Sequence, residues 1–360
     1  MKKTKFNSLH KKLNAKLVDF VGYEMPIQYS SIINEHKAVR NSVGVFDVSH
    51  MGQVFVSGEN ALDFVQYITT NDASKLTVGK VQYSAMCYED GGIVDDLLVY
   101  RLGEDNFMLV INASNIDKDF DWMNKNHKFN VDLKNESDEY SLLAVQGPKS
   151  KDTLQKICSK ELDLEYYTFF TAVIAGTEMI VSRTGYTGEL GYEIYFKGDE
   201  RTAEKIWNAV FEAGQEFNIQ PIGLAARDSL RLEMGFCLYG NDIDNTTNPL
   251  EAGLGWITKL KKGEFLGSSA IQKAKDNGLS RKLVALITNE KAFPRSGYDL
   301  SFNGEIVGKI TSGTVSPILE KAIALGYVKS DLASDGNTIN FLIRGKEIPA
   351  QIVKLPFVKK

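Results

Sequence analysis

The sequence predicts an α+β protein of two or three domains that ends in a small all-β domain. The chain has 360 residues, which is more than one compact hydrophobic core usually holds. Helix and strand patterns alternate in the first third, whereas short strands separated by turns follow Arg281. The content of 43% hydrophobic and 24% charged residues is typical of a globular protein.

The first two thirds mix both kinds of element. Ser31 can cap a helix that runs to Arg40, and another helix is expected to begin near Leu224. The β-rich segments 96–101 and 107–112 predict an antiparallel hairpin. The charged stretch that follows the hairpin is expected to mark the edge of a sub-domain.

The segment 281–360 predicts a small β-barrel or β-sandwich. Its apolar runs alternate with turn signals such as Asn-Gly and Asp-Gly, a spacing typical of all-β domains. Strands are expected at 283–287, 306–310, 323–328 and 339–343.

Composition excludes several classes of function. A net charge of -4 gives no general attraction to nucleic acid. The chain lacks the roughly 18 consecutive apolar residues of a membrane span, and no signal-peptide core follows the basic start, so a cytoplasmic protein is expected. Cys87, Cys158 and Cys237 lie far apart and without metal-ligand spacing, which predicts reduced, packed thiols.

The most informative segment is 91–100, a Gly-Gly turn followed by a β-rich run. Because side chains alternate along a strand, Asp96 lies beside Leu98 and Tyr100, and Asp95 lies on the other face. Both faces are apolar beyond their first residue, so one carboxylate is expected to be buried, at a site that uses it. The alternative is that both aspartates end the turn and face solvent.

Segment 182–193 holds glycines three apart, bracketed by Arg183, Glu189 and Glu193. It has neither the ending of a phosphate loop nor a following helix, so it does not predict nucleotide binding. The glycines are expected to let the backbone approach a ligand or a neighbouring strand. Glu193 shares a strand face with Tyr195 and is either a ligand contact or a solvated strand residue.

The helix near Leu224 carries two arginines four residues apart, and hence on one face. Leu224 and Leu230 flank Arg227 and draw it toward the packed side, where a guanidinium requires a carboxylate from the chain or from a ligand. The alternative is a surface ion pair with Asp228 or Glu233.

Segment 46–52 contains Asp47, Ser49 and His50, the residue types of a nucleophilic triad. Adjacent residues cannot supply triad geometry, because a triad is assembled in space from separate segments. His50 is therefore interpreted as a structural or pocket-wall histidine.

Taken together, these segments resemble the glycine cleavage system T protein family, which are aminomethyltransferases that use tetrahydrofolate. The resemblance extends from about residue 6 to residue 357, in the order and spacing of the family. The matching segments are 22–26 (GYEMP), 46–52 (FDVSHMG), 91–97 (GGIVDDL), 183–189 (RTGYTGE), 223–233 (GLAARDSLRLE) and 238–242 (LYGND).

The resemblance implies a three-domain cloverleaf around a central folate channel. Its first domain would comprise 1–50 and 140–245, interleaved with a second domain at 51–139. A connecting segment at 246–280 would lead to the C-terminal β-domain at 281–360, which the strand pattern also predicts.

The resemblance also implies the site residues. Asp96 matches the family's essential aspartate beside the reacting folate nitrogens, and Glu193 and Arg227 match its folate-binding glutamate and arginine. Several relatives extend to a folate-contacting tyrosine beyond the Pro-Phe of the tail, whereas this chain ends at Lys360 without one. Further pocket-wall positions are matched by Met51, Tyr83, Tyr100, Asn112 and Trp256.

The implied reaction transfers the methylene carbon of an aminomethyl group, carried on the lipoyl arm of the H-protein, to tetrahydrofolate. The products are ammonia, 5,10-methylenetetrahydrofolate and the reduced arm, and no metal or nucleotide is required. The implied partners are the lipoylated H-protein and folate, without nucleic acid or membrane, for a monomer.

Family H-proteins tend to be acidic, so a basic docking patch is expected. The alternative is a solvated basic face without a partner. The candidates are Lys259, Lys261 and Lys262, and the N-terminal Lys11, Lys12 and Lys16.

Two other functions share the resemblance. Non-enzymatic folate-binding factors for iron–sulfur assembly resemble K-G-C-x-x-G-Q-E, where this chain has Glu264 in place of the cysteine. A folate-dependent demethylase of a methylated amine or sulfonium compound would share the fold and the folate site, and would differ at the mouth of the channel.

Overall fold

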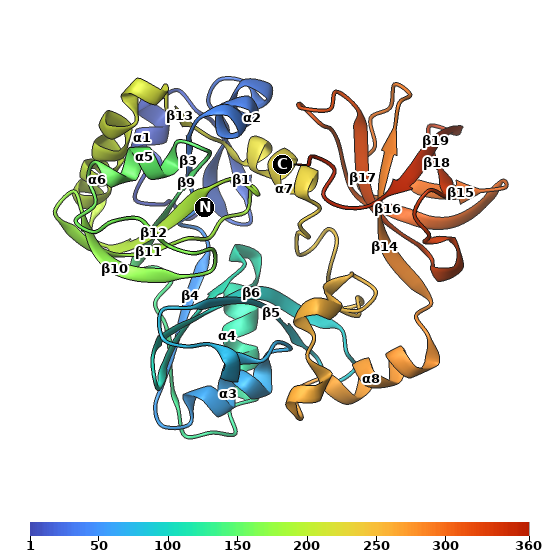
Figure 1. The fold of residues 1–360 in the computed structure, drawn as a ribbon, viewed down its shortest axis with the longest axis horizontal. Helices are drawn as coiled ribbons and strands as arrows, with labels where there is room; N and C mark the ends of the chain where they lie inside the picture. The colour runs from blue at the N-terminus through green and yellow to red at the C-terminus, as the bar shows by residue number, and fades with distance from the viewer. Residues whose placement is uncertain (360) are drawn as a thin grey trace. The chain divides into compact units, whose positions relative to one another are not determined.

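The α+β fold expected from the sequence is confirmed in the computed structural model, which describes residues 1–359 (Figure 1). The chain divides into two units, each assembled from segments far apart in the sequence. The first unit is Met1–Phe64, Ser74–Gln82 and Leu98–Asp228, and the second is Val65–Ala73, Tyr83–Leu97 and Ser229–Lys360. The domain boundaries expected from the sequence stay predictions.

A six-stranded sheet forms the centre of the first unit, in the order β10-β11-β12-β9-β3-β13. Neighbouring strands are antiparallel except β13, which runs parallel to β3. The strands are β3 (Gly44–Asp47), β9 (Tyr140–Gln146), β10 (Phe169–Ile174), β11 (Thr177–Ser182), β12 (Gly191–Lys197) and β13 (Gln220–Pro221). A separate two-stranded sheet pairs β1 (Lys16–Phe20) with β2 (Tyr23–Gln28).

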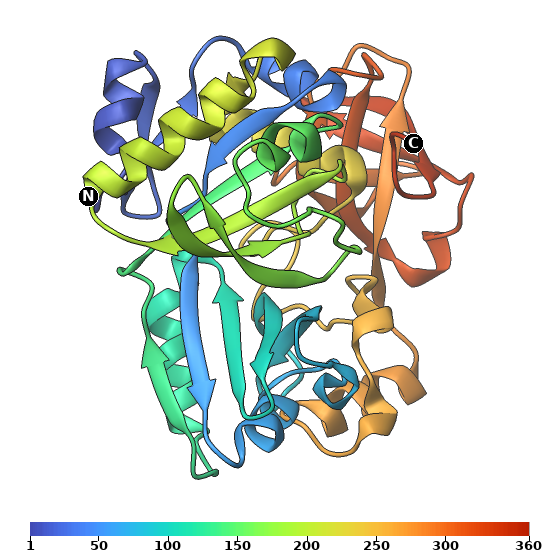
Figure 2. The same ribbon diagram turned by 60° about the vertical axis from the view of Figure 1, so that its left-hand side comes forward.

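Helix α6 (Glu200–Ala213) packs on the six-stranded sheet (Figure 2). Its apolar residues recur at helical spacing, so one face of the helix enters the core with Val145 and Ile194 of the sheet. The helix begins at the cap Asp199, whose carboxylate accepts from the Thr202 backbone N–H at 2.9 Å.

The two helices that the sequence predicts, after Ser31 and near Leu224, are both present. The Ser31 side chain accepts from the Asn34 backbone N–H at 3.2 Å, which confirms the expected cap. Besides α6, the helices are α1 (Asn7–Lys12), α2 (Ile32–Asn41), α3 (Ala61–Ile68), α4 (Ile116–Lys125), α5 (Ser150–Gln155), α7 (Leu224–Met234) and α8 (Ser268–Asn277). In residues 1–359, no helix is long and apolar enough to cross a bilayer.

A five-stranded sheet has the order β5-β6-β7-β4-β8. Its β6-β7 hairpin confirms the expected one, although β6 extends further in both directions. The charged stretch after the hairpin is not a plain edge: it folds into α4 and into β8, which pairs with β4 at the border of the sheet, where charged residues discourage further pairing. The strands are β4 (Gly52–Ser57), β5 (Val81–Cys87), β6 (Ile93–Gly103), β7 (Asn106–Ile111) and β8 (Asp132–Asn135).

The C-terminal strands close into a barrel in the order β14-β17-β16-β15-β18-β19, which decides between the expected barrel and sandwich. The four expected strands are confirmed. Two more were not expected, because β15 is only four residues long and β19 contains Pro349. The strands are β14 (Arg281–Thr288), β15 (Asp299–Phe302), β16 (Glu305–Val315), β17 (Ala322–Lys329), β18 (Thr338–Ile343) and β19 (Lys346–Val353).

All three cysteines are free thiols, as expected. Cys87 and Cys237 are buried, and Cys158 is half-buried. Burial raises the pKa of the Cys87 and Cys237 thiols, so both stay protonated and act as packing residues.

Candidate functional site

The residues expected to form the site divide between the two units. The first unit holds Met51, Tyr100, Asn112, Glu193 and Arg227. The second unit holds Tyr83, Asp96 and Trp256.

Glu193 lies inside the six-stranded sheet, on β12 between β11 and β9. Only 8% of the residue is exposed, which excludes a solvated strand residue. Its Oε2 accepts hydrogen bonds from Thr184 Oγ1 at 2.5 Å and from the Tyr195 hydroxyl at 3.4 Å. Both hydrogen bonds that this carboxylate receives within residues 1–359 are accepted by Oε2. Its other oxygen, Oε1, can accept from a ligand.

Tyr100 is fully buried and joins the hydroxyl groups around Glu193. Its own hydroxyl lies 3.0 Å from Ser182 Oγ and 3.0 Å from the Tyr195 hydroxyl, and 3.2 Å from Thr184 Oγ1. Burial, and then the charge of Glu193, raise the pKa of the Tyr100 phenol, so it stays protonated. We call Tyr100, Ser182, Thr184, Glu193 and Tyr195 the glutamate cluster.

Burial and the neighbouring polar groups shift the pKa of Glu193, the carboxyl group of the glutamate cluster, in opposite directions. Burial raises the pKa of Glu193, whereas the hydrogen bond from Thr184, the positive charge of Arg227 and the Tyr195 hydroxyl lower it, and burial prevails. Such a carboxylate gains much from a further donor inside the buried site. The cluster is therefore suited to orient a ligand through that ligand's N–H groups.

Gly185, in the loop between β11 and β12, and Gly191, the first residue of β12, lie against a neighbouring strand. A Cβ on Gly185 would lie 2.0 Å from the Gln146 side chain of β9, and a Cβ on Gly191 would lie 2.3 Å from it. The Gln146 amide uses this space to donate to the Thr184 carbonyl at 3.1 Å and to accept from Thr187 Oγ1 at 2.9 Å. Close approach of a neighbouring strand, one of the two expected reasons, therefore explains these glycines.

Arg227 lies in the first turns of α7 and is half-buried. Its guanidinium carbon is 4.6 Å from the centre of the Tyr186 ring. The loop that carries Tyr186 is tied down by Arg40, which donates to the Thr187 carbonyl at 2.7 Å and pairs with Glu189 at 2.8 Å. Neither Tyr186 nor Arg40 was expected from the sequence.

Met51 and Asn112 lie at the same end of the five-stranded sheet. Gly52, the first residue of β4, pairs with Ile111, the last residue of β7. The residues just beyond this pair are Met51 and Asn112, and both are half-buried. The strand register therefore brings together two of the expected pocket-wall positions.

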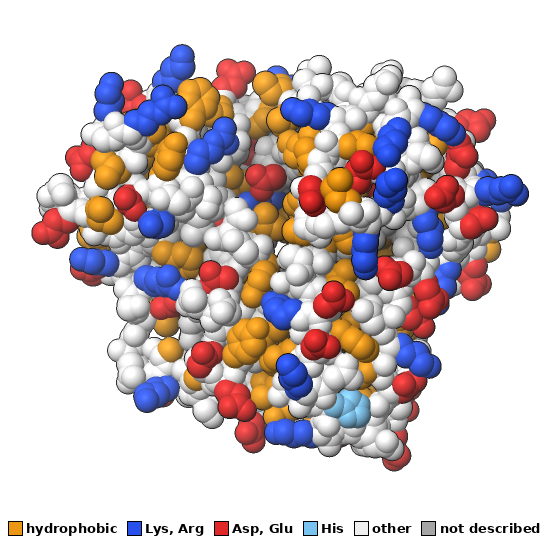
Figure 3. All heavy atoms as spheres, turned by 180° about the vertical axis from the view of Figure 1, so that it is seen from behind, with side chains coloured by type: hydrophobic (Ala, Val, Ile, Leu, Met, Phe, Trp, Pro, Cys, Tyr) orange, Lys and Arg blue, Asp and Glu red, His pale blue; other side chains and the backbone are white. Residues whose placement is uncertain are grey.

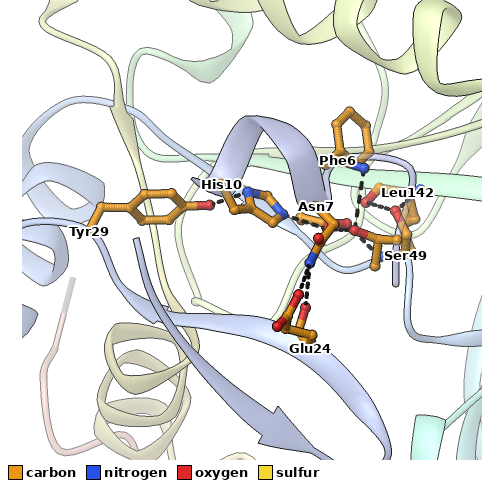
Figure 4. A network of polar contacts seen from close by, with 9 residues as sticks. Phe6, Asn7, His10, Glu24, Tyr29, Ser49 and Leu142 are labelled. Carbon is orange, nitrogen blue, oxygen red and sulfur yellow. Dashed lines mark hydrogen bonds and ion pairs between the residues drawn. The ribbon is translucent and has the colours of Figure 1, made fainter. Parts of the chain in front are cut away.

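A buried network holds the turn that carries His50 and Met51 (Figure 4). The Asp47 carboxylate lies 2.9 Å from His10 Nε2 and accepts from the Ser49 backbone N–H at 2.9 Å. On its other side, His10 Nδ1 lies 2.8 Å from the Tyr29 hydroxyl.

The histidine that contacts Asp47 is thus His10, to which no sequence pattern points, and not His50, three residues further along the chain. Burial alone would raise the pKa of Asp47, but the hydrogen bond and charge of His10, with the bonds from Thr4 and Ser49, outweigh it and hold the pKa below its usual value. These contacts agree with a structural role for segment 46–52.

His50 is a buried neutral imidazole whose ring meets Phe20 edge-on, with the centres 5.4 Å apart. Burial, and then the positive charge of Arg227, lower its pKa from 6.5 to about 4, against an opposing effect of Asp47. Since the unfolded chain binds a proton at this residue near pH 6.5 and the folded chain does not, stability is lost as the pH falls from 6.5 toward 4.

The unfolding free energy of the wild type should fall between pH 7 and pH 5. We expect this fall to be smaller by about 2 kcal/mol in His50→Gln. Guanidinium unfolding of both proteins at the two pH values measures this difference. His127, which is exposed, provides the matched control, because His127→Gln should keep the full pH dependence. If the unfolding free energy of wild type and of His50→Gln fell equally between pH 7 and pH 5, this would contradict a buried neutral His50.

The second group surrounds Asp96 on β6. Asp96 Oδ2 accepts from the Tyr83 hydroxyl at 2.9 Å, and the Tyr83 ring centre lies 5.8 Å from that of Trp256. Trp256 is 60% exposed. We call Tyr83, Asp96 and Trp256 the aspartate cluster.

The buried member of the aspartate pair is Asp95, not Asp96. Asp95 is fully buried, whereas Asp96 is half-buried, so the expectation that one of the two carboxylates is buried is confirmed. A group that exchanges protons with a substrate must be reachable, which suits Asp96 better than Asp95.

Arg227, expected toward the packed side of α7, is half-buried, and Arg231 on the same face is fully buried. Arg231 pairs with Asp242 at 2.6 Å and donates to Ser312 Oγ at 2.8 Å. One expectation for a charged residue needs correction. Lys262 does not belong to a solvated patch, because its ammonium donates to backbone carbonyls near the end of α3. Burial lowers its pKa to about 7, opposed by the charge of Asp72.

Comparisons with known proteins match the whole chain. The GCVT N-terminal domain matches residues 6–262, and the glycine cleavage T-protein C-terminal barrel domain matches 281–359. An aminomethyltransferase of Halothermothrix orenii is 52% identical over 359 residues, covering 99% of this chain and 100% of the relative. One of Flavobacterium psychrophilum is 52% identical over 363 residues and covers both chains fully.

A solved structure agrees with the sequence relatives. The crystal structure of glycine cleavage system aminomethyltransferase T from Bartonella henselae superposes with a TM-score of 0.92 at 35% identity, covering 99% of this chain and 98% of that one. The family expected from the sequence motifs is therefore confirmed. This chain belongs to the aminomethyltransferases of the glycine cleavage system, the T-protein family, which uses tetrahydrofolate.

Proposed function

We propose that this chain transfers the methylene carbon of the aminomethyl-lipoyl arm of an H-protein to tetrahydrofolate. The reaction releases ammonia and gives 5,10-methylenetetrahydrofolate and the dihydrolipoyl arm. The observation that carries this proposal is Asp96, a half-buried carboxylate held by the Tyr83 hydroxyl at 2.9 Å.

Asp96 supplies the acid–base and electrostatic part of the reaction. The departing amine carries positive charge, which a nearby carboxylate stabilises, and the same carboxylate can relay a proton as ammonia leaves. The Tyr83 hydrogen bond fixes the orientation of the carboxylate. The exposed Trp256 ring offers an apolar surface next to this pair.

The glutamate cluster orients the folate. The amino-pyrimidine edge of a pterin presents adjacent N–H donors, which suit the Oε1 side of Glu193. Arg227, held over Tyr186, adds donors and positive charge for acceptor atoms of the same substrate. Met51 and Asn112 are proposed as walls of this site.

Turnover with aminomethylated H-protein, compared with free methylated amines and sulfonium compounds, tests the proposal. We expect folate-dependent ammonia release from the H-protein substrate and negligible turnover of the free compounds. The opposite preference would support a demethylase. We also expect a monomer in the cytoplasm, which size-exclusion chromatography and cell fractionation check.

The H-protein is proposed to dock through the exposed Lys259 and Lys261, near Trp256 in the sequence. On the face that Figure 3 shows, basic and acidic side chains are interspersed. Two of the three N-terminal candidates are less available, since Lys11 pairs with Glu24 and Lys12 with Glu204, each at 2.8 Å.

We expect the KM for H-protein to rise steeply between low and physiological salt, because exposed charges are screened over roughly 8 to 10 Å. Lys259→Gln combined with Lys261→Gln should raise it at low salt and flatten the salt dependence. The KM for folate should change much less. Steady-state kinetics over a salt series measures both constants, and a salt-independent KM for H-protein would exclude electrostatic docking.

A further inference from the structure

Lys262 closes the C-terminal end of α3 and the loop that follows it. Its Nζ donates to the carbonyl oxygens of Gln66 and Thr69 at 2.6 Å each, and to that of Asn71 at 2.7 Å. The protonated Lys262 amine has three N–H donors, one for each of these backbone carbonyls. The Gln66 carbonyl lies in the last turn of α3 and the Thr69 carbonyl directly follows it, where the helix itself provides no partner.

The segment 69–71 that Lys262 holds is bonded to β5 on one side. The Thr70 backbone N–H donates to the Ala85 carbonyl at 2.8 Å, and Asn71 Nδ2 donates to the Tyr83 carbonyl at 2.8 Å. The Tyr83 side chain then donates to Asp96. The position of Tyr83 therefore depends on the segment that the ammonium holds.

The same segment is bonded to the chain around Trp256. Thr70 Oγ1 donates to the Ile257 carbonyl at 3.1 Å, and the Lys259 backbone N–H donates to the Thr70 carbonyl at 2.9 Å. These two bonds follow Trp256 directly in the sequence. One short segment thus fixes both aromatic residues of the aspartate cluster.

We propose that Lys262 is a positioning residue for the transfer reaction, which acts through segment 69–71 to hold Tyr83 and Trp256 beside Asp96. The inference rests on the proposed function, in which the aspartate cluster carries the chemistry. Lys262 touches neither Tyr83 nor Asp96 in this arrangement, so its effect is transmitted by the hydrogen bonds of the segment. Displacement of reacting groups by about 1 Å can cost about 100-fold in rate.

Lys262→Ala removes the ammonium and leaves room for it to be replaced by a small amine. We expect kcat for transfer to fall about 10- to 100-fold, with a much smaller change in the KM for H-protein. n-Propylammonium, which matches the deleted atoms, should restore at least a tenth of the wild-type rate. Tetramethylammonium has no N–H donor and should restore none. Lys273→Ala, at an exposed position of α8, is the matched control.

Hydrogen exchange gives a readout that does not depend on turnover. In Lys262→Ala, exchange at the amides of Thr70, Ala85 and Lys259 should accelerate, while barrel amides such as Leu286 should keep the wild-type rate. n-Propylammonium should reverse the acceleration. This result would show that Lys262 holds segment 69–71, even if the chain proved to act on a different folate-linked substrate.

Three outcomes would overturn the inference. Unchanged exchange at Thr70, Ala85 and Lys259 would show that the ammonium does not hold the segment. Faster exchange throughout the unit, including the barrel, would make Lys262 a residue of general stability. Local loosening with full transfer activity would show that the position of segment 69–71 does not matter for the reaction.

Discussion

Asp96→Asn is expected to lower the rate of transfer by about 10²- to 10⁴-fold while the fold and most of the folate affinity remain. The substitution keeps the shape of the side chain and removes its charge and its capacity to bind a proton. An amide oxygen can still accept from the Tyr83 hydroxyl, so the local geometry should survive. Single-turnover kinetics with aminomethylated H-protein measures the loss directly.

Asp95→Asn is the matched comparison, because it makes the same chemical change one residue earlier on β6. Asp95 is fully buried, so we expect this variant to lose stability and to keep its rate per folded molecule. Tyr83→Phe should give a smaller rate loss than Asp96→Asn, since it leaves the carboxylate in place. If Asp96→Asn kept a near-normal rate of transfer while a folded Asp95→Asn protein was inactive, the assignment of the two aspartates would be reversed.

Glu193→Ala is expected to weaken folate binding by about 2 kcal/mol or more, because donors on the bound ligand lose a buried charged partner. Arg227→Ala should weaken binding to a similar extent. The two side chains influence each other through charge, but the hydrogen bonds that Glu193 receives come from Thr184 and Tyr195. Isothermal titration calorimetry with tetrahydrofolate measures each change.

Thr184→Val separates binding from stability at this site. It removes the hydroxyl that donates to Glu193 Oε2 and leaves the carboxylate itself. We expect lower stability and a smaller loss of folate affinity than for Glu193→Ala. If Glu193→Ala kept its folate affinity while its melting temperature fell sharply, the glutamate would be a structural residue of the sheet.

The parts of the fold that depend on local patterns were predictable. The Ser31 cap, the β6-β7 hairpin and the strands with strong alternation follow from short-range rules. The polar strand β8 was missed because its pairing with β4 depends on residues distant in the sequence, and β15 was missed because it is only four residues long. No local pattern reveals that β13 will run parallel to β3.

For the site, resemblance selected Asp96, Glu193 and Arg227, together with Tyr83, which holds Asp96. Thr184 and Tyr186, which contact Glu193 and Arg227, were missed. Strand parity placed Glu193 beside Tyr195, and the structure joins them by a hydrogen bond. Nothing in the sequence near His10 indicates that its ring will meet Asp47, since 37 residues separate them. The burial of Lys262 is equally non-local, because its acceptors, in α3 and in the loop after it, lie almost 200 positions earlier.

The crowding of Gly185 and Gly191 against Gln146 bears on how such proteins are classified. Gly185 and Gly191 of RTGYTGELG leave room for one amide side chain beneath a loop, which is a requirement of architecture. A relative that had exchanged one reaction for another would keep these two glycines as long as its sheet kept the same amide. The two glycines are therefore markers of ancestry, and a classifier that aims to separate transferases from demethylases should weigh the neighbours of Asp96 instead.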